Sequence, residues 1–460
     1  MIRAILVFLA LAVLPATAEE MRVPQGEAEI RTGFVPVVRV TAPAVVNIYA
    51  KRIVRGRRSP FEDDPFFGSL FRDFNEPRPR IQNSLGSGVI LGEDGLVVTN
   101  FHVVGRATDI RVVLNDRREF SARVLLSDEE SDLAVLQIQE AGQMPALELR
   151  DSDTVEVGEL VLAIGNPFGV GQTVSSGIVS GLARSGTATG NARGYFIQTD
   201  APINPGNSGG ALVDVNGRLI GINTSILTRS GGSDGIGFAI PSALVRQVLT
   251  QARAGNTRFE RPWAGLGGQT VTSDMADGLG LDRPGGVAVS QVHPQSPFHD
   301  AGLRPGDVIT EVDGEPVNTP AEMIFRMSVA GLGTDASVSF YRQGRVRTVS
   351  VSMIAPPNIP PPDQVETGPA AAIPGLVLSR VNPAIVARYD LPLSAEGVVV
   401  EDPGAIGTRA GLREGDVLRA INGVPVRTPA QAGELLTEAR GRLALEVQRG
   451  TRRAVLRFRL

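Results

Sequence analysis

The stretch Asn204–Leu212, NPGNSGGAL, places a serine among small residues that let backbone and substrate approach closely. Glycine tolerates the positive φ angles that a tight nucleophile turn needs. In such a turn Ser208 can present its hydroxyl outward, and the backbone N–H groups of Gly206 and Ser208 can converge on an oxyanion. A serine hydroxyl is a weak nucleophile until a base takes its proton. The stretch therefore requires a histidine elsewhere in the chain.

The base can be chosen among only three histidines, His102, His293 and His299. His102 alone precedes Ser208, and it lies in the stretch 95–104, at the end of an apolar run that we expect to form a strand. A lone histidine can also be a packed core residue, but its place in the chain favours the role of general base. The other two histidines are expected to be surface or packing residues, and three histidines this dispersed have no zinc-site spacing.

The third catalytic group is predicted to be Asp132, which opens the apolar run 132–136. A carboxylate is needed there to fix the imidazole tautomer and to stabilise its cation. The order His102, Asp132, Ser208 is that of chymotrypsin-like double barrels, and it differs from the orders of subtilisin and the α/β-hydrolases. The rivals of Asp132 by composition alone are Asp109, Asp116, Asp128 and Asp200.

Four motifs in this order resemble those of the HtrA family of serine proteases, of the bacterial periplasmic DegP/DegQ type. They are TNFHVV at 99–104, DLAV at 132–135, GNPFG at 165–169 and GNSGG at 206–210. The resemblance runs from about residue 34 to the C-terminus. It implies a mainly β protein, with a chymotrypsin-like double β-barrel protease domain followed by two PDZ domains. It also implies a homotrimer that expands to larger homo-oligomers.

An internal repeat supports the two PDZ domains, because AGLRPGDV at 301–308 recurs as AGLREGDV at 410–417. The segment between the copies is rich in proline and alanine, as is typical of an extended linker. The predicted divisions are a signal peptide at 1–18, the protease domain at 34–255, the first PDZ domain at 258–354, a Pro-rich linker at 355–372 and the second PDZ domain at 373–460.

PDZ domains bind peptides by strand addition, with a backbone loop that captures the terminal carboxylate. The resemblance assigns that loop to the start of each domain. The predicted peptide-binding residues are Trp263, Ala264, Gly265 and Leu266 in the first domain and Gly375 and Leu376 in the second. The alternative is that both domains only hold an oligomer together.

Composition limits the remaining possibilities. The chain has 460 residues, no cysteine and a formal net charge of −4, which excludes disulfides and thiol catalysis and gives no support to nucleic-acid binding. We expect no metal or other cofactor. Residues 1–18 have the charged, apolar and small-residue regions of a cleavable signal peptide, so the mature protein is expected in the periplasm. The alternative is an uncleaved anchor, but the apolar run is short for a span, which needs about 20 residues.

Specificity can be argued from the segment before the nucleophile, which lines the primary pocket in chymotrypsin-like folds. It contains Ile203 and no carboxylate at the pocket base, so cleavage after cationic residues is not expected. The resemblance implies cleavage after small aliphatic residues, with Ile203 as a pocket wall. Asn207 stands where digestive relatives carry an acid that pairs with a freed N-terminus, and a neutral amide cannot form that ion pair.

Regulation is expected in loops. The segment 181–186 matches the family's sensor loop, and the resemblance gives Arg184 the role of relaying PDZ or substrate occupancy to the oxyanion segment; the alternative is a surface arginine. The segment 51–82 resembles a long loop that blocks a neighbour's site at rest, or else it is a disordered insertion. Residues 34–40 are the candidate trimer contact.

The leading function is an ATP-independent periplasmic serine endoprotease that degrades misfolded or unfolded exported proteins. Its partners would be unfolded protein substrates and C-terminal peptides. One alternative is a holdase chaperone in which cleavage matters little. The other is a regulatory protease that one specific C-terminal peptide triggers.

Overall fold

The computed structural model describes the backbone of most of the chain. The described ranges are 33–54, 80–105, 107–166, 171–185, 195–204, 206–226, 235–450 and 452–459. The predicted signal peptide and the part of the segment 51–82 between residues 55 and 79 lie outside them.

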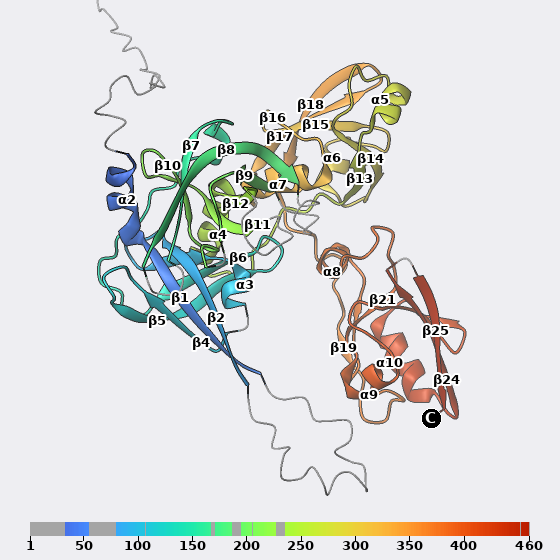
Figure 1. Ribbon diagram of the computed structural model, residues 1–460. Helices are drawn as coiled ribbons and strands as arrows, with labels where there is room; N and C mark the ends of the chain where they lie inside the picture. Colours follow the sequence, from blue (N-terminus) through green and yellow to red (C-terminus); the bar gives the residue numbers. More distant parts are fainter. Residues whose placement is uncertain are drawn as a thin grey trace, which may run out of the picture.

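Two closed six-stranded antiparallel barrels form the N-terminal half of the molecule (Figure 1). The first barrel has the strand order β1-β2-β3-β6-β5-β4, and the second has the order β10-β11-β12-β9-β8-β7. The first contains β1 (Val45–Val54), β2 (Arg80–Ile90), β3 (Leu96–Thr99), β4 (Asp109–Val113), β5 (Glu119–Asp128) and β6 (Leu133–Ile138). The second contains β7 (Leu160–Gly165), β8 (Thr173–Ser185), β9 (Tyr195–Thr199), β10 (Ala211–Asp214), β11 (Leu219–Ile226) and β12 (Gly237–Pro241).

Short apolar strands rich in β-branched residues build these barrels. All four residues of β3 are buried, as are five of the six in β6, so both faces of these strands pack on apolar neighbours. Burial on both faces explains why the runs show no polar alternation. The helix α4 (Ser242–Arg253) follows the second barrel and buries an apolar face, as its sequence pattern predicts. The short elements around the barrels are α2 (Val35–Thr41), η1 (Ala42–Ala44), α3 (Phe101–Val104) and η2 (Ser152–Thr154).

Two further sheets follow the barrels, and their element orders match except for the additional first strand of the second sheet, which reflects the sequence repeat. The first has the order β13-β14-β15-β17-β18, and the second has the order β19-β20-β21-β22-β24-β25. The first comprises β13 (Leu266–Thr270), α5 (Ser273–Leu279), β14 (Val287–Val292), α6 (Pro297–Asp300), β15 (Val308–Val312), β16 (Glu315–Pro316), α7 (Pro320–Ala330), β17 (Asp335–Arg342) and β18 (Arg345–Ser352). The second comprises β19 (Val365–Glu366), β20 (Val377–Arg380), α8 (Pro383–Arg388), β21 (Val398–Asp402), α9 (Gly404–Arg409), β22 (Val417–Ile421), β23 (Val424–Pro425), α10 (Pro429–Glu438), β24 (Arg442–Arg449) and β25 (Arg452–Arg459).

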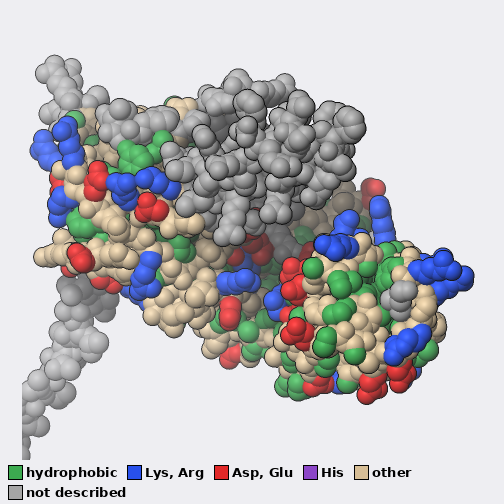
Figure 2. Space-filling model, turned by 90° about the horizontal axis from the view of Figure 1, so that it is seen from below, with side chains coloured by type: hydrophobic (Ala, Val, Ile, Leu, Met, Phe, Trp, Pro, Cys, Tyr) green, Lys and Arg blue, Asp and Glu red, His purple; other side chains and the backbone are tan. Residues whose placement is uncertain are grey.

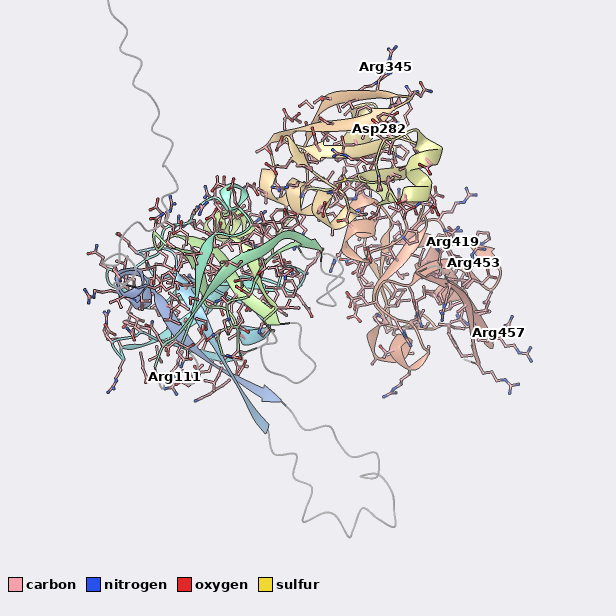
Figure 3. The ribbon with its side chains drawn as sticks, turned by 45° about the horizontal axis from the view of Figure 1, so that its top comes forward. Arg111, Asp282, Arg345, Arg419, Arg453 and Arg457 are labelled. Atoms are coloured by element: carbon pink, nitrogen blue, oxygen red, sulfur yellow. The ribbon has the colours of Figure 1, made fainter. Side chains whose placement is uncertain are left out.

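The prediction of a double barrel followed by two PDZ-like sheets is confirmed. Each sheet ends in a hairpin whose outer strand carries exposed arginines, and Figure 3 shows Arg345 on β18 and Arg457 on β25 extending away from the molecule. Charged side chains on an edge strand oppose pairing with another chain. On the face seen in Figure 2, basic and acidic side chains are intermixed. No helix among the described residues is long and apolar enough to cross a membrane.

The first PDZ sheet is joined to the second barrel through α7, which lies between them in Figure 1. The ring of Phe325 stacks on Tyr195 of β9 with 3.9 Å between centroids. The neighbouring Arg326 is 9% exposed, donates to Asp153 Oδ1 at 2.6 Å and to Glu315 Oε2 at 3.0 Å, and lies over the Tyr195 ring. Burial alone would lower the pKa of Arg326, but its neighbours, chiefly Tyr195 and Asp153, outweigh burial and raise that pKa.

Replacing Arg326 by methionine should weaken this junction, because two carboxylates lose their buried cation while the apolar stem is kept. We expect the free energy of unfolding to fall by about 1–3 kcal/mol, the range for removing one partner of a charged hydrogen bond. The measurement is urea unfolding followed by the fluorescence of Trp263, the only tryptophan. Arg345→Met, on an exposed strand, is the matched control and should change the free energy by less than about 0.5 kcal/mol. Equal losses in the two variants would contradict this role of Arg326.

Candidate active site

His102 and Asp132 meet on the first barrel. Both carboxylate oxygens lie close to the imidazole, with His102 Nδ1 at 3.0 Å from Asp132 Oδ1 and at 2.8 Å from Oδ2. The backbone N–H of His102 also donates to Oδ1 at 3.0 Å. A carboxylate at Nδ1 selects the tautomer with the proton on Nδ1, which leaves Nε2 with a free lone pair. The pair is therefore arranged to accept a proton at Nε2.

His102 was predicted at the end of a strand, and the structure places it in the short helix α3 that directly follows β3. The strand ends at Thr99, and Phe101–Val104 form one helical turn. The backbone N–H of Phe101 and the side-chain amide of Asn100 both donate to the carbonyl of Asp132, at 3.1 and 3.0 Å. These bonds draw the chain out of the sheet and toward Asp132, which a local apolar pattern does not reveal.

Asp132 has a positive φ of 56°, an uncommon conformation for a residue other than glycine. Aspartate tolerates this region better than most residues. The turn that holds it is stabilised by Asp128, which accepts from the Ser131 backbone N–H at 2.9 Å and pairs with Arg261 at 2.5 Å. Backbone strain of this kind is found where the surrounding structure demands one side-chain direction. Here that direction points the carboxylate at His102.

Thr224 on β11 connects the two barrels at the site. Its hydroxyl donates to Asp132 Oδ2 at 2.7 Å, and its backbone carbonyl accepts from Ser208 Oγ at 2.9 Å. The Ser208 hydroxyl thus donates to a backbone carbonyl. Within the described part of the chain, no hydrogen bond joins Ser208 to His102. A rotation about the serine Cα–Cβ bond is needed before the hydroxyl can donate to the imidazole. Catalytic hydrogen bonds are often looser in the absence of substrate.

The nucleophile turn itself depends on glycine. Gly206 and Gly209 have φ angles of 99° and 82°. A Cβ at Gly209 would lie 2.1 Å from the carbonyl oxygen of Ser87, so only glycine fits this close approach of two backbones. Asn207 is buried and accepts a hydrogen bond from the Thr173 hydroxyl at 2.6 Å. Digestive relatives are expected to carry an acid where this chain has Asn207.

Ser87, in β2, is a residue that the sequence reasoning missed. Its hydroxyl donates to the carbonyl of Gly206 at 2.6 Å and accepts from the backbone N–H of Asn166 at 2.8 Å. Its own backbone N–H donates to the carbonyl of Ser208 at 2.9 Å. A fully buried serine on the first barrel therefore holds both residues whose N–H groups are expected to bind the oxyanion. Its only sequence signal is a serine between glycines in an apolar strand.

The remaining predicted residues of the protease domain lie on the second barrel. Ile203 is 1% exposed and packs against Gly237 of β12 within the barrel core. Arg184 belongs to β8, opposite Phe196 of β9, and its side chain lies outside the described part of the structure. The helix α2, which holds most of the candidate trimer contact, exposes Val35 and Val40 to solvent by 58% and 70%.

The predicted peptide-binding loops differ between the two PDZ domains. In the first, Trp263 is buried against His293, Ala264 is half-buried, and Gly265, with φ at 58°, leads into Leu266 at the start of β13. In the second, the N–H groups of Gly375 and Leu376 already donate to Thr367, at its carbonyl and its hydroxyl respectively.

Chemically, the site brings together a carboxylate-oriented imidazole and a serine hydroxyl at the junction of two barrels, which suits acyl transfer. The described residues contain no group of His, Asp and Glu side chains arranged to hold a metal ion. His293 and His299 lie in the first PDZ domain, whereas His102 lies in α3 of the first barrel. Burial lowers the pKa of His293.

The comparisons with known proteins agree with this geometry. A family model described as a trypsin-like peptidase domain matches residues 86–222, and two PDZ-domain models match 264–353 and 397–449. The periplasmic pH-dependent serine endoprotease DegQ of Escherichia coli (strain K12) is 37% identical over 430 residues, which are 92% of this chain and 90% of that protein.

Periplasmic serine endoprotease DegP of the same strain is 37% identical over 468 residues, which are 96% of this chain and 95% of that protein. Among solved structures, the HtrA-type protease AlgW with decapeptide is 40% identical. It covers 70% of this chain and 99% of its own, with a TM-score of 0.53. The chain therefore belongs to the HtrA family, as a serine endoprotease of the DegP/DegQ type with a trypsin-like domain and two PDZ domains.

Proposed function

We propose that Ser208 is the nucleophile of this serine endoprotease, His102 its general base and acid, and Asp132 the group that orients His102. The observation that carries the proposal is the contact of both Asp132 oxygens with His102 Nδ1, beside a threonine that links Asp132 to Ser208. The Ser208 hydroxyl leaves the Thr224 carbonyl and gives its proton to His102 Nε2 as Oγ attacks the scissile carbonyl. The protonated imidazole then gives that proton to the leaving amine, and water hydrolyses the acyl-enzyme by the reverse sequence.

The N–H groups of Gly206 and Ser208 are proposed to bind the oxyanion of the tetrahedral intermediate. Such donors contribute only if they are fixed before the charge develops. Support comes from Ser87, which holds the carbonyls of these two residues from the opposite barrel. Ser87 acts through the loop and is a positioning residue.

Cleavage is proposed to follow small aliphatic residues. Ile203 fills the core beside Gly237, and no acidic side chain lies in the described segment before the nucleophile, 201–204. A cationic side chain would find no partner there. An apolar wall formed by Ile203 would suit a short apolar side chain better than a charged one.

The substrates are proposed to be misfolded or unfolded exported proteins, met in the periplasm after the signal peptide is removed. The relatives named above are periplasmic endoproteases. The PDZ domains, through Trp263–Leu266 in the first and Gly375 and Leu376 in the second, are proposed to receive C-terminal peptides by strand addition. A mainly chaperone role is the second candidate, since the Ser208 hydroxyl is turned to Thr224 in the absence of substrate.

Regulation is proposed to use the β8–β9 connection and self-association. Arg184 lies near the end of β8, and Tyr195, the first residue of β9, stacks on Phe325 of the PDZ helix α7, so β9 contacts the PDZ domain directly after this connection. The exposed Val35 and Val40 of α2 offer an apolar surface for a trimer. The segment 51–82 is proposed to block a neighbouring site at rest.

Digestion of unfolded casein distinguishes the proposed protease function from the chaperone function. The mature chain should cleave casein and spare a stably folded protein such as lysozyme, while Ser208→Ala should lose at least about 1,000-fold in rate, as removal of a nucleophile does. Fluorescent-casein release and intact-mass analysis of the fragments give the rate and the cleavage sites. If the mature chain and Ser208→Ala both suppress casein aggregation and neither cleaves casein, the chaperone function would be favoured over the protease function.

Ser87→Ala should lower kcat about tenfold to a hundredfold with little change in KM, because the freed Gly206 carbonyl lets the oxyanion loop relax. Steady-state kinetics on a chromogenic peptide measure the split. Ser242→Ala is the matched control, since its buried hydroxyl, at the start of α4, donates to the Arg150 carbonyl at 2.5 Å and contacts none of the proposed catalytic residues by a hydrogen bond. A loss of kcat of similar size in both variants would show a general effect on stability and refute the positioning role.

A further inference from the structure

The second PDZ sheet begins with a strand that has no counterpart in the first. β19 pairs with β20 in antiparallel register, with Val365 opposite Leu378 and Glu366 opposite Val377. The pairing extends beyond β19, because the Arg380 N–H donates to the Pro362 carbonyl at 2.6 Å. Residues 362–367, predicted from sequence as part of an extended linker, thus run along the edge of β20.

The same segment occupies the loop that was predicted to capture a carboxylate. The Gly375 N–H donates to the Thr367 carbonyl at 2.9 Å, and the Leu376 N–H donates to the Thr367 hydroxyl at 2.9 Å. Thr367 also gives its backbone N–H to the Leu376 carbonyl at 3.0 Å and its hydroxyl to the Ile373 carbonyl at 2.6 Å. Thr367 is 5% exposed, so these bonds are shielded from water. Its carbonyl and hydroxyl oxygens thus accept from the two N–H groups that were predicted to receive a terminal carboxylate.

The helix α10 closes the other side of this groove. A Cβ at Gly433 of α10 would lie 3.6 Å from Val365 Cγ1, so the valine is in van der Waals reach of the helix. The strand β19 and the helix α10 are in contact. The segment therefore lies between a strand edge and a helix, which is how a peptide binds by strand addition.

The first PDZ domain lacks this strand. β13 follows the predicted loop there as β20 does here, and it stands at the end of its sheet. Its outer edge is unpaired by any strand of the described ranges. An unpaired edge is a template for an added strand. The two repeats therefore differ in whether a described strand pairs with this edge.

We propose that residues 362–367 are a built-in strand ligand of the second PDZ domain, which keeps its groove closed to C-terminal peptides. The first PDZ domain is then the one that captures chain ends. The inference rests on the proposed peptide binding by PDZ domains. A tethered segment competes at an effective concentration of roughly millimolar. Since apparent affinity scales with the open fraction, a segment docked about 99% of the time would weaken peptide binding about 100-fold.

The test is hydrogen exchange in the full chain carrying Ser208→Ala, resolved to residues 265–270 and 374–380. The probe is a pool of decapeptides with randomised last three residues and a free carboxylate, and the same pool amidated is its control. In the parent protein the Gly375 and Leu376 amides should exchange slowly, and the pool should protect only 265–270. Thr367→Ala should speed exchange at Gly375 and Leu376 at least tenfold, and the free-carboxylate pool should then restore protection.

Two further variants keep the result interpretable. Thr408→Ala, in α9, removes an exposed helical hydroxyl from the same domain and should leave both regions unchanged. The chain has no cysteine, so Glu366→Cys with Val377→Cys can lock β19 to β20 as the only disulfide. The oxidised lock should exchange and respond to the pool as the parent does.

Two results would overturn the inference. One is fast exchange at Gly375 and Leu376 in the parent protein. The other is a peptide response at 374–380 in the parent that disappears on oxidation of the lock. Failure of 265–270 to respond to either pool would instead count against peptide capture by the first domain. Exchange in the parent and in Thr367→Ala, measured without peptide, would still decide whether β19 closes the groove.

Discussion

Thr224 makes the contact on which the rest of the site depends, because it touches both parts of the proposed catalytic group, which is divided between two barrels. Its hydroxyl reaches Asp132 on the first barrel, and its carbonyl receives Ser208 on the second. Neither barrel holds a complete site. In the proposed mechanism, the position of one barrel relative to the other therefore matters as much as the identity of the three side chains, because small shifts in such geometry are costly.

The structure fixes that relative position with buried hydrogen bonds at close backbone contacts. Ser87 on the first barrel binds the carbonyls of Gly206 and Ser208, while the lack of a Cβ at Gly209 lets the two chains meet. Each buried bond contributes about 1 kcal/mol net, but leaving one partner unpaired costs more. The strained backbone of Asp132 is likewise held by long-range hydrogen bonds, which Asn100 and Phe101 donate to its carbonyl.

Much of this could be predicted from the sequence. The order of His102, Asp132 and Ser208, the glycines around the serine and the repeated AGL motif are local patterns, and the confirmed fold follows from them. Ser87, Thr224 and Arg326 could not be predicted, since their partners lie 119, 92 and 173 residues away in the chain. Nor could β19, because a proline-rich composition predicts an extended chain without saying which sheet edge it meets. His102 was expected at the end of a strand, and long-range hydrogen bonds to Asp132 place it on a helical turn after that strand.

The most direct test of the link between the barrels is Thr224→Val, which removes the hydroxyl that binds Asp132 but keeps the carbonyl that receives Ser208. The account predicts a loss in kcat on the order of tenfold, as for other groups that orient a catalytic ligand or base, with KM and thermal stability nearly unchanged. Thr310→Val, which removes a hydroxyl bonded to the Ser339 carbonyl in the first PDZ domain, should leave kcat as it is. An unchanged kcat in Thr224→Val would contradict the claim that this threonine aligns the two halves of the site.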